Sequence, residues 1–424
     1  MNRLAKLNIL ILLLGIGLSI SIFPVTGQPV SQNNSLALTG AKIYPSPLEK
    51  PIDKGVVLIR NGKIVALGEE GKVKIPSNSV IIDCTGLTLM AGFWNSHVHF
   101  IESKWVNAAS MPPSQLTQQL EDMLTSYGFT TVFDTGSDWE ITKTIRQRIE
   151  SGVVKGPKIF STGPILFPKG GTPPANLLKG YDIIIQKMPE IENAQQATRV
   201  VRQEIKNGVD AVKIYAQTWW DPNLKMPPDV IKAVIAEAHR HNKLVFVHPS
   251  GSYGLEAAIE SGADILAHTN PATGPWDTAL LTRMKQAHLS LIPTLKLWRV
   301  DLEKGGAPPN VVREFQETGV GQLKAYFQAG GQILFGTDLG YIADYNPTEE
   351  YQLMQKAGMR FQDILASLTT APAKRFGMSG RTGRIATGLD ADIVVLTDDP
   401  MTNIEALSGV KYTLRKGQVI YQSK

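Results

Sequence analysis

The sequence has little of several features, and each scarcity excludes a class of protein. Cys84 is the only cysteine among 424 residues, so the chain cannot form an intrachain disulfide. It has no block of lysine and arginine with interleaved aromatic residues, so nucleic-acid binding has no support despite a formal net charge of +5. Internal repeats and low-complexity segments are missing as well. What is present is an ordinary globular composition, 43% apolar and 19% charged, which predicts a folded chain with a large core.

The first 27 residues have the composition of an export signal. Arg3 and Lys6 precede an apolar run over residues 9–23, which is followed by a proline and small residues up to Gly27. This order predicts a secretory signal at residues 1–27, cut near Gly27, and hence an exported protein, periplasmic or secreted. An uncleaved membrane anchor is the alternative, because the apolar run is slightly long for a signal.

Between about residues 87 and 335, short β-rich runs alternate with amphipathic helical segments, clearest at 194–206 and 230–240. Such alternation is typical of a parallel sheet, because each parallel connection needs a crossover of helical length. The candidate strands are residues 87–94, 130–134, 158–162, 211–215, 244–247, 264–267, 290–294 and 332–335. Eight strands, each followed by a helix, predict an α/β fold of the (β/α)8 TIM-barrel type.

The two flanks of this region have a different pattern. Short strand-like runs surround the dipeptide Asn61-Gly62 near one end and Lys416-Gly417 near the other. An Asn-Gly pair between alternating segments predicts a β-hairpin. Each flank is too small for a good core of its own. We therefore expect residues 28–88 and 378–424 to form one small, discontinuous β-sandwich domain beside a barrel of residues 89–377.

Potential metal ligands lie in or just after several candidate strands, near the carboxyl ends where TIM barrels place their active sites. His97 and His99 follow the first strand. In extended backbone, residues two apart face the same side, so both imidazoles can reach one ion. The other members belong to the fourth, fifth, sixth and eighth strands: Lys213, His248, His268 and Asp338. An ordered set on five strands predicts a metal centre, whereas one His-x-His pair would be weak evidence.

A second His-x-His pair provides an internal control. His239 and His241 stand at the end of a predicted helix, where residues two apart point to nearly opposite sides and cannot chelate one ion. We expect both at the surface. His288 precedes the seventh strand, which places it on the opposite, structural face of the barrel.

The sequence resembles the amidohydrolase superfamily over nearly the whole mature chain. Residues 90–99, Met-Ala-Gly-Phe-Trp-Asn-Ser-His-Val-His, are close to the usual entry into the first strand, and residues 383–394 resemble the return into the small β-domain. Within the superfamily, the likeness is to imidazolonepropionase-related and Xaa-Pro dipeptidase-like hydrolases, through residues 212–215, 247–250 and 267–269. Ala91 stands where the family usually has proline, and Asn95 where aspartate is common.

The resemblance implies a two-metal site. His97, His99 and Asp338 would hold one divalent ion, and His248 and His268 the other. Lys213, carboxylated by carbon dioxide to a carbamate, would bridge the two ions, since a plain ammonium there would be repelled. Zinc is expected from the ligand types, with manganese, iron or cobalt as alternatives. The alternative for Lys213 is a lysine that points out of the barrel into a salt bridge.

This centre would hydrolyse a C–N bond of a small substrate, either an amide, a peptide or a cyclic amide. A metal-bridging hydroxide would attack, and Asp338 would act as general base and then acid. Tyr215 shares the inward face with Lys213 and is expected to contact the substrate. A dipeptide or N-acyl amino acid would suit the apolar residues of the candidate loops 167–175, 219–220 and 270–276.

Other functions fit the same residues. A mononuclear deaminase is the main rival, but such enzymes typically carry a glutamate soon after the fifth-strand histidine. Here no acidic residue lies between His248 and Glu256. A phosphotriester or lactone hydrolase would use the same site. A non-catalytic binding protein on the same barrel is the alternative from another class. The expected partner is a small-molecule substrate. Membrane contact would occur only through an uncleaved N-terminus, and a homo-oligomer is left open.

Overall fold

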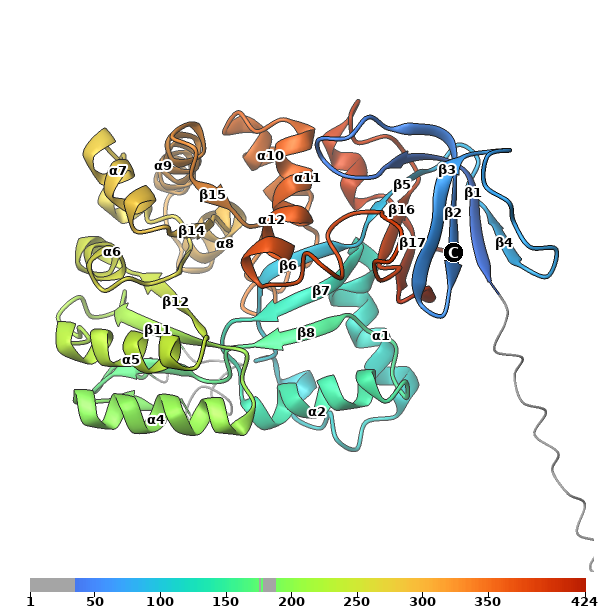
Figure 1. The fold of residues 1–424 in the computed structure, drawn as a ribbon. Coiled ribbons are helices and arrows are strands. Elements are labelled where there is room, and N and C mark those ends of the chain that lie inside the picture. The colour runs from blue at the N-terminus through green and yellow to red at the C-terminus, as the bar shows by residue number, and fades with distance from the viewer. Residues whose placement is uncertain (1–34, 175–176, 178–187) are drawn as a thin grey trace, which may run out of the picture. The chain divides into compact units, whose positions relative to one another are not determined.

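A computed structural model describes residues 35–174, 177 and 188–424 (Figure 1). The predicted signal at residues 1–27 lies outside this part of the chain, so the signal and export stay predictions. Within the described ranges, no helix combines the length and the apolar character needed to cross a membrane.

Strands from both ends of the chain share one hydrogen-bonded sheet. The N-terminal members are β1 (Leu36–Tyr44), β2 (Ile52–Arg60), β3 (Lys63–Glu69), β4 (Val80–Asp83) and β5 (Thr88–Ala91), and the C-terminal members are β16 (Ile393–Leu396), β17 (Val410–Arg415) and β18 (Gln418–Gln422). Their order is β18-β17-β16-β5-β1-β2-β3, with β4 paired to β1. The junction between the two ends is the antiparallel pair β5–β16. The two flanks therefore meet in one sheet, while their description as a separate sandwich domain stays a prediction.

Both predicted hairpins are present in this sheet. Asn61 and Gly62 join β2 to β3 with φ angles of 50° and 75°. Lys416 and Gly417 join β17 to β18 with φ angles of 49° and 72°. Two successive positive φ angles give the turn twist that matches paired strands, which is why Asn-Gly is favoured there.

The central region consists of parallel strands in two sheets. One sheet contains β6 (Phe93–Val98), β7 (Phe129–Asp134) and β8 (Lys158–Ser161) in that order. The other contains β10 (Glu190–Ile191), β9 (Ile165–Pro168), β11 (Ala211–Gln217), β12 (Leu244–Pro249), β13 (Ile265–Ala267), β14 (Ser290–Ile292) and β15 (Gln332–Ile333) in that order. Backbone hydrogen bonds connect the sheets at both junctions. Asp210 N–H donates to the Ser161 carbonyl (2.7 Å), and Ser96 N–H donates to the Phe335 carbonyl (2.7 Å).

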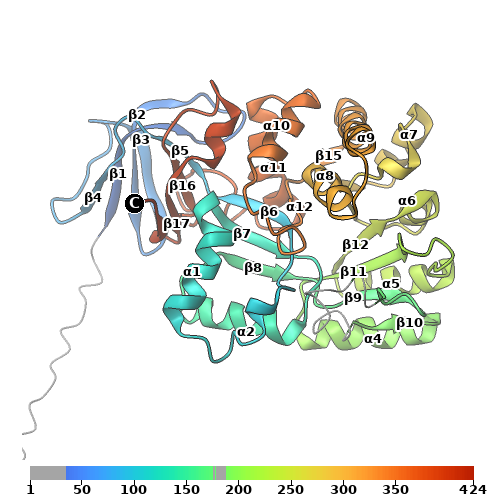
Figure 2. The same ribbon diagram turned by 180° about the vertical axis from the view of Figure 1, so that it is seen from behind.

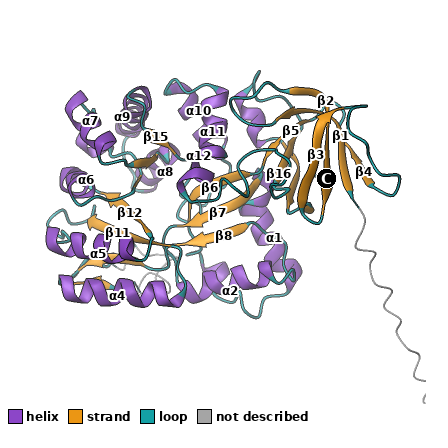
Figure 3. Cartoon of the chain, viewed as in Figure 1, coloured by secondary structure: helices purple, strands orange, loops and turns teal. Residues whose placement is uncertain are grey.

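Helices alternate with these strands along the chain (Figures 2 and 3). They are α1 (Pro113–Met123), α2 (Trp139–Glu150), α4 (Ala194–Asn207), α5 (Pro228–Arg240), α6 (Gly251–Glu260), α7 (Thr278–Gln286), α8 (Leu295–Lys304), α9 (Pro309–Gln328), α10 (Thr348–Lys356), α11 (Phe361–Leu368) and α12 (Thr370–Arg375). Their apolar faces pack with the outward side chains of the strands in the largest core cluster. The helices predicted at 194–206 and 230–240 correspond to α4 and α5.

A separate, smaller apolar cluster lies among the parallel strands themselves. Its buried members come from strands of both sheets or directly follow one: Phe133, Ala211, Phe246, Ile265, Ile292 and Leu334. Phe160 of β8 packs against this cluster, and Trp94 of β6 stacks on Phe160 with ring centroids 5.7 Å apart. Side chains from all eight predicted strands or their immediate ends therefore meet in a common interior.

The first predicted strand, residues 87–94, is wrong as a single element. Its first half is β5, which pairs with β1 and β16 in the terminal sheet, and its second half begins β6 among the parallel strands. Gly92 stands between the halves, and its N–H donates to the Asp392 carbonyl (2.9 Å). One continuous apolar run thus contributes strands to two sheets. The sequence does not show the division, because both halves are buried and apolar and polar residues do not alternate in either.

Candidate active site

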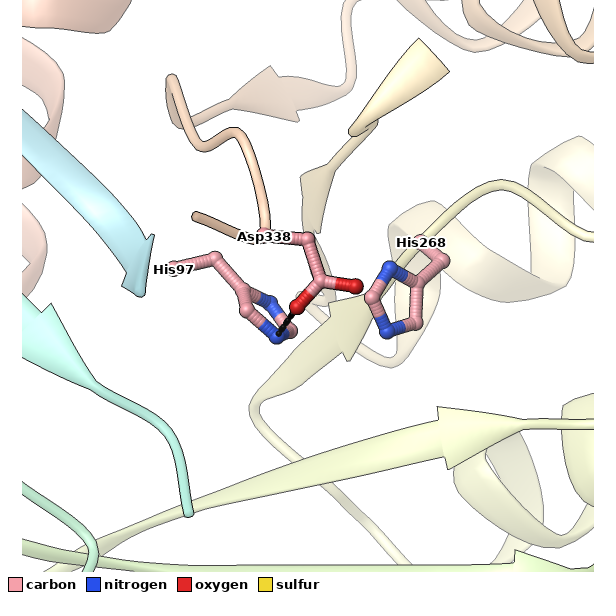
Figure 4. Close-up of side chains that lie close together, drawn as sticks. All are labelled: His97, His268 and Asp338. Carbon is pink, nitrogen blue, oxygen red and sulfur yellow. Dashed lines mark ion pairs between the residues drawn. The ribbon is translucent and has the colours of Figure 1, made fainter. Parts of the chain in front are cut away.

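The carboxyl ends of the parallel strands bring three of the predicted ligands together. One donor atom each from His97, His268 and Asp338 lies within 4.8 Å of the others. In Figure 4 the Asp338 carboxylate lies between the two imidazole rings. All three residues are buried, at 4% exposure or less. Burying polar groups without enough hydrogen-bond partners costs free energy. A ligand bound by these three side chains would offset that cost.

His99 belongs to the same cluster. Its Nε2 lies 3.2 Å from Nε2 of His97. Oδ1 of Asp338 lies 3.1 Å from Nε2 of His97 and 2.9 Å from Nε2 of His99. Four-coordinate ions with bonds of about 2.0–2.1 Å hold neighbouring donor atoms about 3.3 Å apart, and higher coordination brings them closer. Three donor atoms spaced at 2.9–3.2 Å therefore fit one face of a metal's coordination shell.

Lys213 and His248 line the same cavity, and His248 lies outside the three-residue group. The Lys213 side chain is 1% exposed and makes no hydrogen bond or ion pair with any described residue. Burial lowers its pKa to about 7, so a large fraction is a neutral amine near neutral pH. His248 lies beside the cluster, with its ring centroid 4.7 Å from that of His268. Lys213 does not point outward into a salt bridge, which was the alternative expectation.

The charge state of the cluster suits metal ligation. Burial lowers the pKa of His97 to about 3 and holds the pKa values of His248 and His268 well below the ordinary value, so these imidazoles are neutral. Burial opposes ionisation of Asp338, but its interactions with His97 and His99 outweigh burial and hold its pKa well below the usual range. Neutral imidazoles and an ionised carboxylate are the forms that bind divalent metals.

Neighbouring groups fix the orientation of two rings. The His99 Nδ1 lies 2.8 Å from the Gly136 carbonyl, and the His268 Nδ1 lies 2.7 Å from Thr294 Oγ1. These contacts leave the Nε2 side of each ring free for the cluster, as is usual for metal-binding histidines. Backbone strain is concentrated here as well, because His268, Thr294 and Asp338 have φ angles of 87°, 45° and 63°.

Asp134 is a buried acid beside the site that the sequence reasoning missed. It ends β7 and accepts hydrogen bonds from the hydroxyls of Ser137 (2.6 Å), Thr142 (2.7 Å) and Ser161 (2.9 Å), while burial raises its pKa. It also accepts from the N–H of Gly136, the residue that orients His99. Its position at the carboxyl end of the second predicted strand was the available signal.

The cluster opens into a cavity of about 400 Å³ with mostly apolar walls. Each of the three candidate loops contributes lining residues, among them Phe167, Trp219, Trp220 and Asn270. Tyr215 lines the cavity too, and its ring stacks on His248 with centroids 4.0 Å apart. Along β11, residues 213, 215 and 217 line the cavity, while 212, 214 and 216 face the core, so the alternation used to predict Tyr215 holds.

The control histidines lie away from the cluster. His239 and His241 are exposed and contact Asp264 (2.8 Å) and Glu237 (3.2 Å) respectively. His288 is exposed in the turn before β14. The surface placement predicted for the helical pair is confirmed.

Comparisons with known proteins agree with this fold. The model of the amidohydrolase family matches residues 88–420. Ochratoxinase of Aspergillus niger is 26% identical over 363 residues, which are 76% of this chain and 73% of that protein. A solved Xaa-Pro dipeptidase with bound methionine in the active site has a TM-score of 0.77 at 21% identity, covering 92% of this chain and 100% of that one. A prolidase complexed with N-methylphosphonate-L-proline has a TM-score of 0.75 at 25% identity, with the same two coverages.

These matches identify the class of protein. A family model that covers most of the chain, together with the strand-end cluster of histidines and an aspartate, shows that the chain belongs to the amidohydrolase family. It is accordingly a hydrolytic enzyme that acts on carbon–nitrogen bonds.

Proposed function

We propose that this enzyme is a metal-dependent amidase for small substrates, built on a single (β/α)8 barrel. The shared interior cluster and the hydrogen bonds at both sheet junctions support a closed barrel. We further propose that residues 28–88 and 378–424 form the companion β-domain, and that residues 1–27 direct export. N-terminal sequencing of protein recovered outside the cytoplasm would test the last point, because a chain starting at Met1 would contradict cleavage.

The observation that carries the amidase proposal is the spacing of Asp338, His97 and His99, whose donor atoms lie 2.9–3.2 Å apart at the base of an apolar cavity. We infer that these three residues hold one divalent ion, zinc by ligand type, and that His248 and His268 hold a second. When bound, such ions polarise a carbonyl oxygen and lower the pKa of water.

We infer that Lys213 completes the site by reacting with carbon dioxide. Its neutral amine would attack carbon dioxide, form an N–C bond and release one proton, which leaves a carbamate with one negative charge. The lowered pKa of this buried amine supports the step, since only the unprotonated form has the lone pair required. The product would supply two oxygen ligands where the ammonium would repel cations.

Asp338 is the residue best placed to move protons. Its Oδ1 faces the two imidazoles, while Oδ2 makes no hydrogen bond or ion pair to a described residue. We propose that this oxygen accepts a proton from the attacking water and delivers it to the nitrogen of the leaving amine. Tyr215, on the wall beside His248, would contact the substrate. Ochratoxinase and the prolidase relatives support an amide or peptide bond as the target, such as that of a dipeptide or N-acyl amino acid.

Metal content of the purified protein, measured by inductively coupled plasma mass spectrometry, tests the proposal. Native intact mass would detect the carbon dioxide adduct in the same sample. Close to two ions per chain, together with the adduct, would support the two-metal amidase. One ion without adduct would point to a deaminase-like centre with a structural Lys213. No ion after reconstitution would contradict a metal-dependent activity and favour a binding protein.

A further inference from the structure

One acidic side chain of the cavity wall has no part in the proposed metal centre. Asp301 lies on α8, whose residues Leu297, Trp298, Asp301 and Leu302 all line the cavity. Their spacing of one, four and five positions puts them on one face of the helix. Three of the four are apolar, so Asp301 carries the one charge among these four lining residues.

The two oxygens of Asp301 have different surroundings. Tyr341 donates its hydroxyl to Oδ1 at 2.6 Å. Oδ2 makes no hydrogen bond or ion pair with a described residue. Lys304, one turn further along the helix, lies over the Tyr341 ring at 5.4 Å from its centroid. Asp301 thus lines the cavity with one oxygen bound by the tyrosine and the other without a partner among the described residues.

The remaining charges of the cavity favour a cationic ligand at this point. Lys213 is the only lysine or arginine among the lining residues that the structure describes, and it would become an anion on carboxylation. Burial raises the pKa of Asp301 and the charge of Asp338 adds to this effect, while the Tyr341 hydrogen bond and the charge of Lys304 oppose it without cancelling it. A cation bound at Oδ2 would offset the free-energy cost of burying the Asp301 charge and its repulsion by Asp338. A carboxylate of the ligand at this point would add to the repulsion.

Aromatic rings give the cavity a second property that suits an amine. Phe167, Tyr215, Trp220 and Trp298 line it, and ring faces attract ammonium groups as well as apolar chains.

We propose that Asp301 is a specificity-determining residue that binds an amino group of the substrate. The inference rests on the proposed amidase function and narrows it to substrates with a free amine, such as aminoacyl amides and dipeptides, in preference to N-acyl amino acids. The ammonium would lie at Oδ2 of Asp301, and its apolar side chain would lie against the rings. The simpler alternative is that Asp301 only anchors Tyr341 and the loop after β15.

Ligand binding to the metal-loaded full-length protein separates these two roles without requiring turnover. The ligands are 2-phenylethylamine and 3-phenylpropanol, which share an aromatic group and differ in charge. Dissociation constants follow from tryptophan fluorescence, since Trp220 and Trp298 line the cavity. We expect the amine to bind at least about 10-fold more tightly than the alcohol, because a hydrogen bond between two charged groups is stronger than one between a carboxylate and a neutral hydroxyl.

Two variants complete the test. Asp301→Asn keeps the shape and an acceptor for Tyr341, so it should weaken amine binding about 10- to 100-fold and leave alcohol binding within about twofold. Tyr341→Phe removes the anchor hydroxyl but keeps the charge, and should retain the preference for the amine. Equal effects of the two variants, or no change in the amine-to-alcohol ratio with Asp301→Asn, would overturn the proposal.

Hydrolysis is scored separately. If the amine binds through Asp301 but neither aminoacyl amides nor N-acyl amino acids are cleaved, the amidase proposal fails while the binding role of Asp301 stands. If N-acyl amino acids are cleaved in preference and the amine binds no better than the alcohol, the amidase proposal stands and the role of Asp301 is refuted.

Discussion

Gly340 offers a sharp test of whether the strand-end geometry sustains catalysis. It has a φ angle of 97° and lies two residues after Asp338. A Cβ atom at this position would lie 1.9 Å from the carbonyl oxygen of His99, a backbone atom that cannot rotate away. Observed Cβ contacts essentially never fall below 3.0 Å, so Gly340→Ala must move the Asp338 loop or the His99 strand by about 1 Å or more.

The cost of this movement can be estimated in two parts. Left-handed backbone costs alanine about 1–2 kcal/mol, and forcing an extra methyl group into packed surroundings adds about 1–3 kcal/mol. A shift of about 1 Å in Asp338 relative to His99 should lower kcat about 100-fold, because proton transfer and metal ligation both depend on that distance. Metal affinity should fall as well.

Gly358 provides the matched control. It has a φ angle of 89°, but nothing lies within 4 Å of its Cβ position. Gly358→Ala should therefore lower the free energy of unfolding only by the backbone cost of about 1–2 kcal/mol, and should keep full kcat and metal content. Urea unfolding, metal analysis and turnover of the best amide substrate would be measured for both variants. Equal kcat and metal content in the two would refute the argument that the contact at His99 maintains the site.

Three further outcomes are expected. Thr294→Val removes the hydroxyl that orients His268 (2.7 Å) and should weaken metal binding about 10- to 100-fold by competition with a chelator, whereas Thr294→Ser should not. His248→Ala should abolish activity and reduce metal content in a folded protein, while the surface change His239→Ala should do neither; full turnover of the first variant would remove His248 from the site. The buried Cys84 thiol has its pKa raised to about 12 by burial, so it stays protonated at pH 8 and should react with a disulfide reagent only after denaturation. Rapid reaction in the native protein would contradict its burial.

The sequence alone determined the features that depend on local pattern. The hairpin between β2 and β3 follows from turn residues that tolerate positive φ, Asn61 and Gly62. The strand-end placement of His97, His268 and Asp338 follows from a general property of parallel strands, whose carboxyl ends gather on one side. The inward position of Tyr215 follows from the period of two along a strand.

Only the tertiary structure decided which residues meet, because such contacts depend on register and crossing between segments far apart in the chain. It divided the apolar run at 87–94 between two sheets, which no local pattern distinguishes, since both halves are buried. It brought Asp134 beside His99 through the Gly136 turn. It also placed Asp301 in the cavity, where its charge can select a cationic ligand because the neighbouring wall residues are mostly apolar. From the sequence alone, an acidic residue on an amphipathic helix is expected to face solvent, and only the packing of the helix shows what the side chain faces.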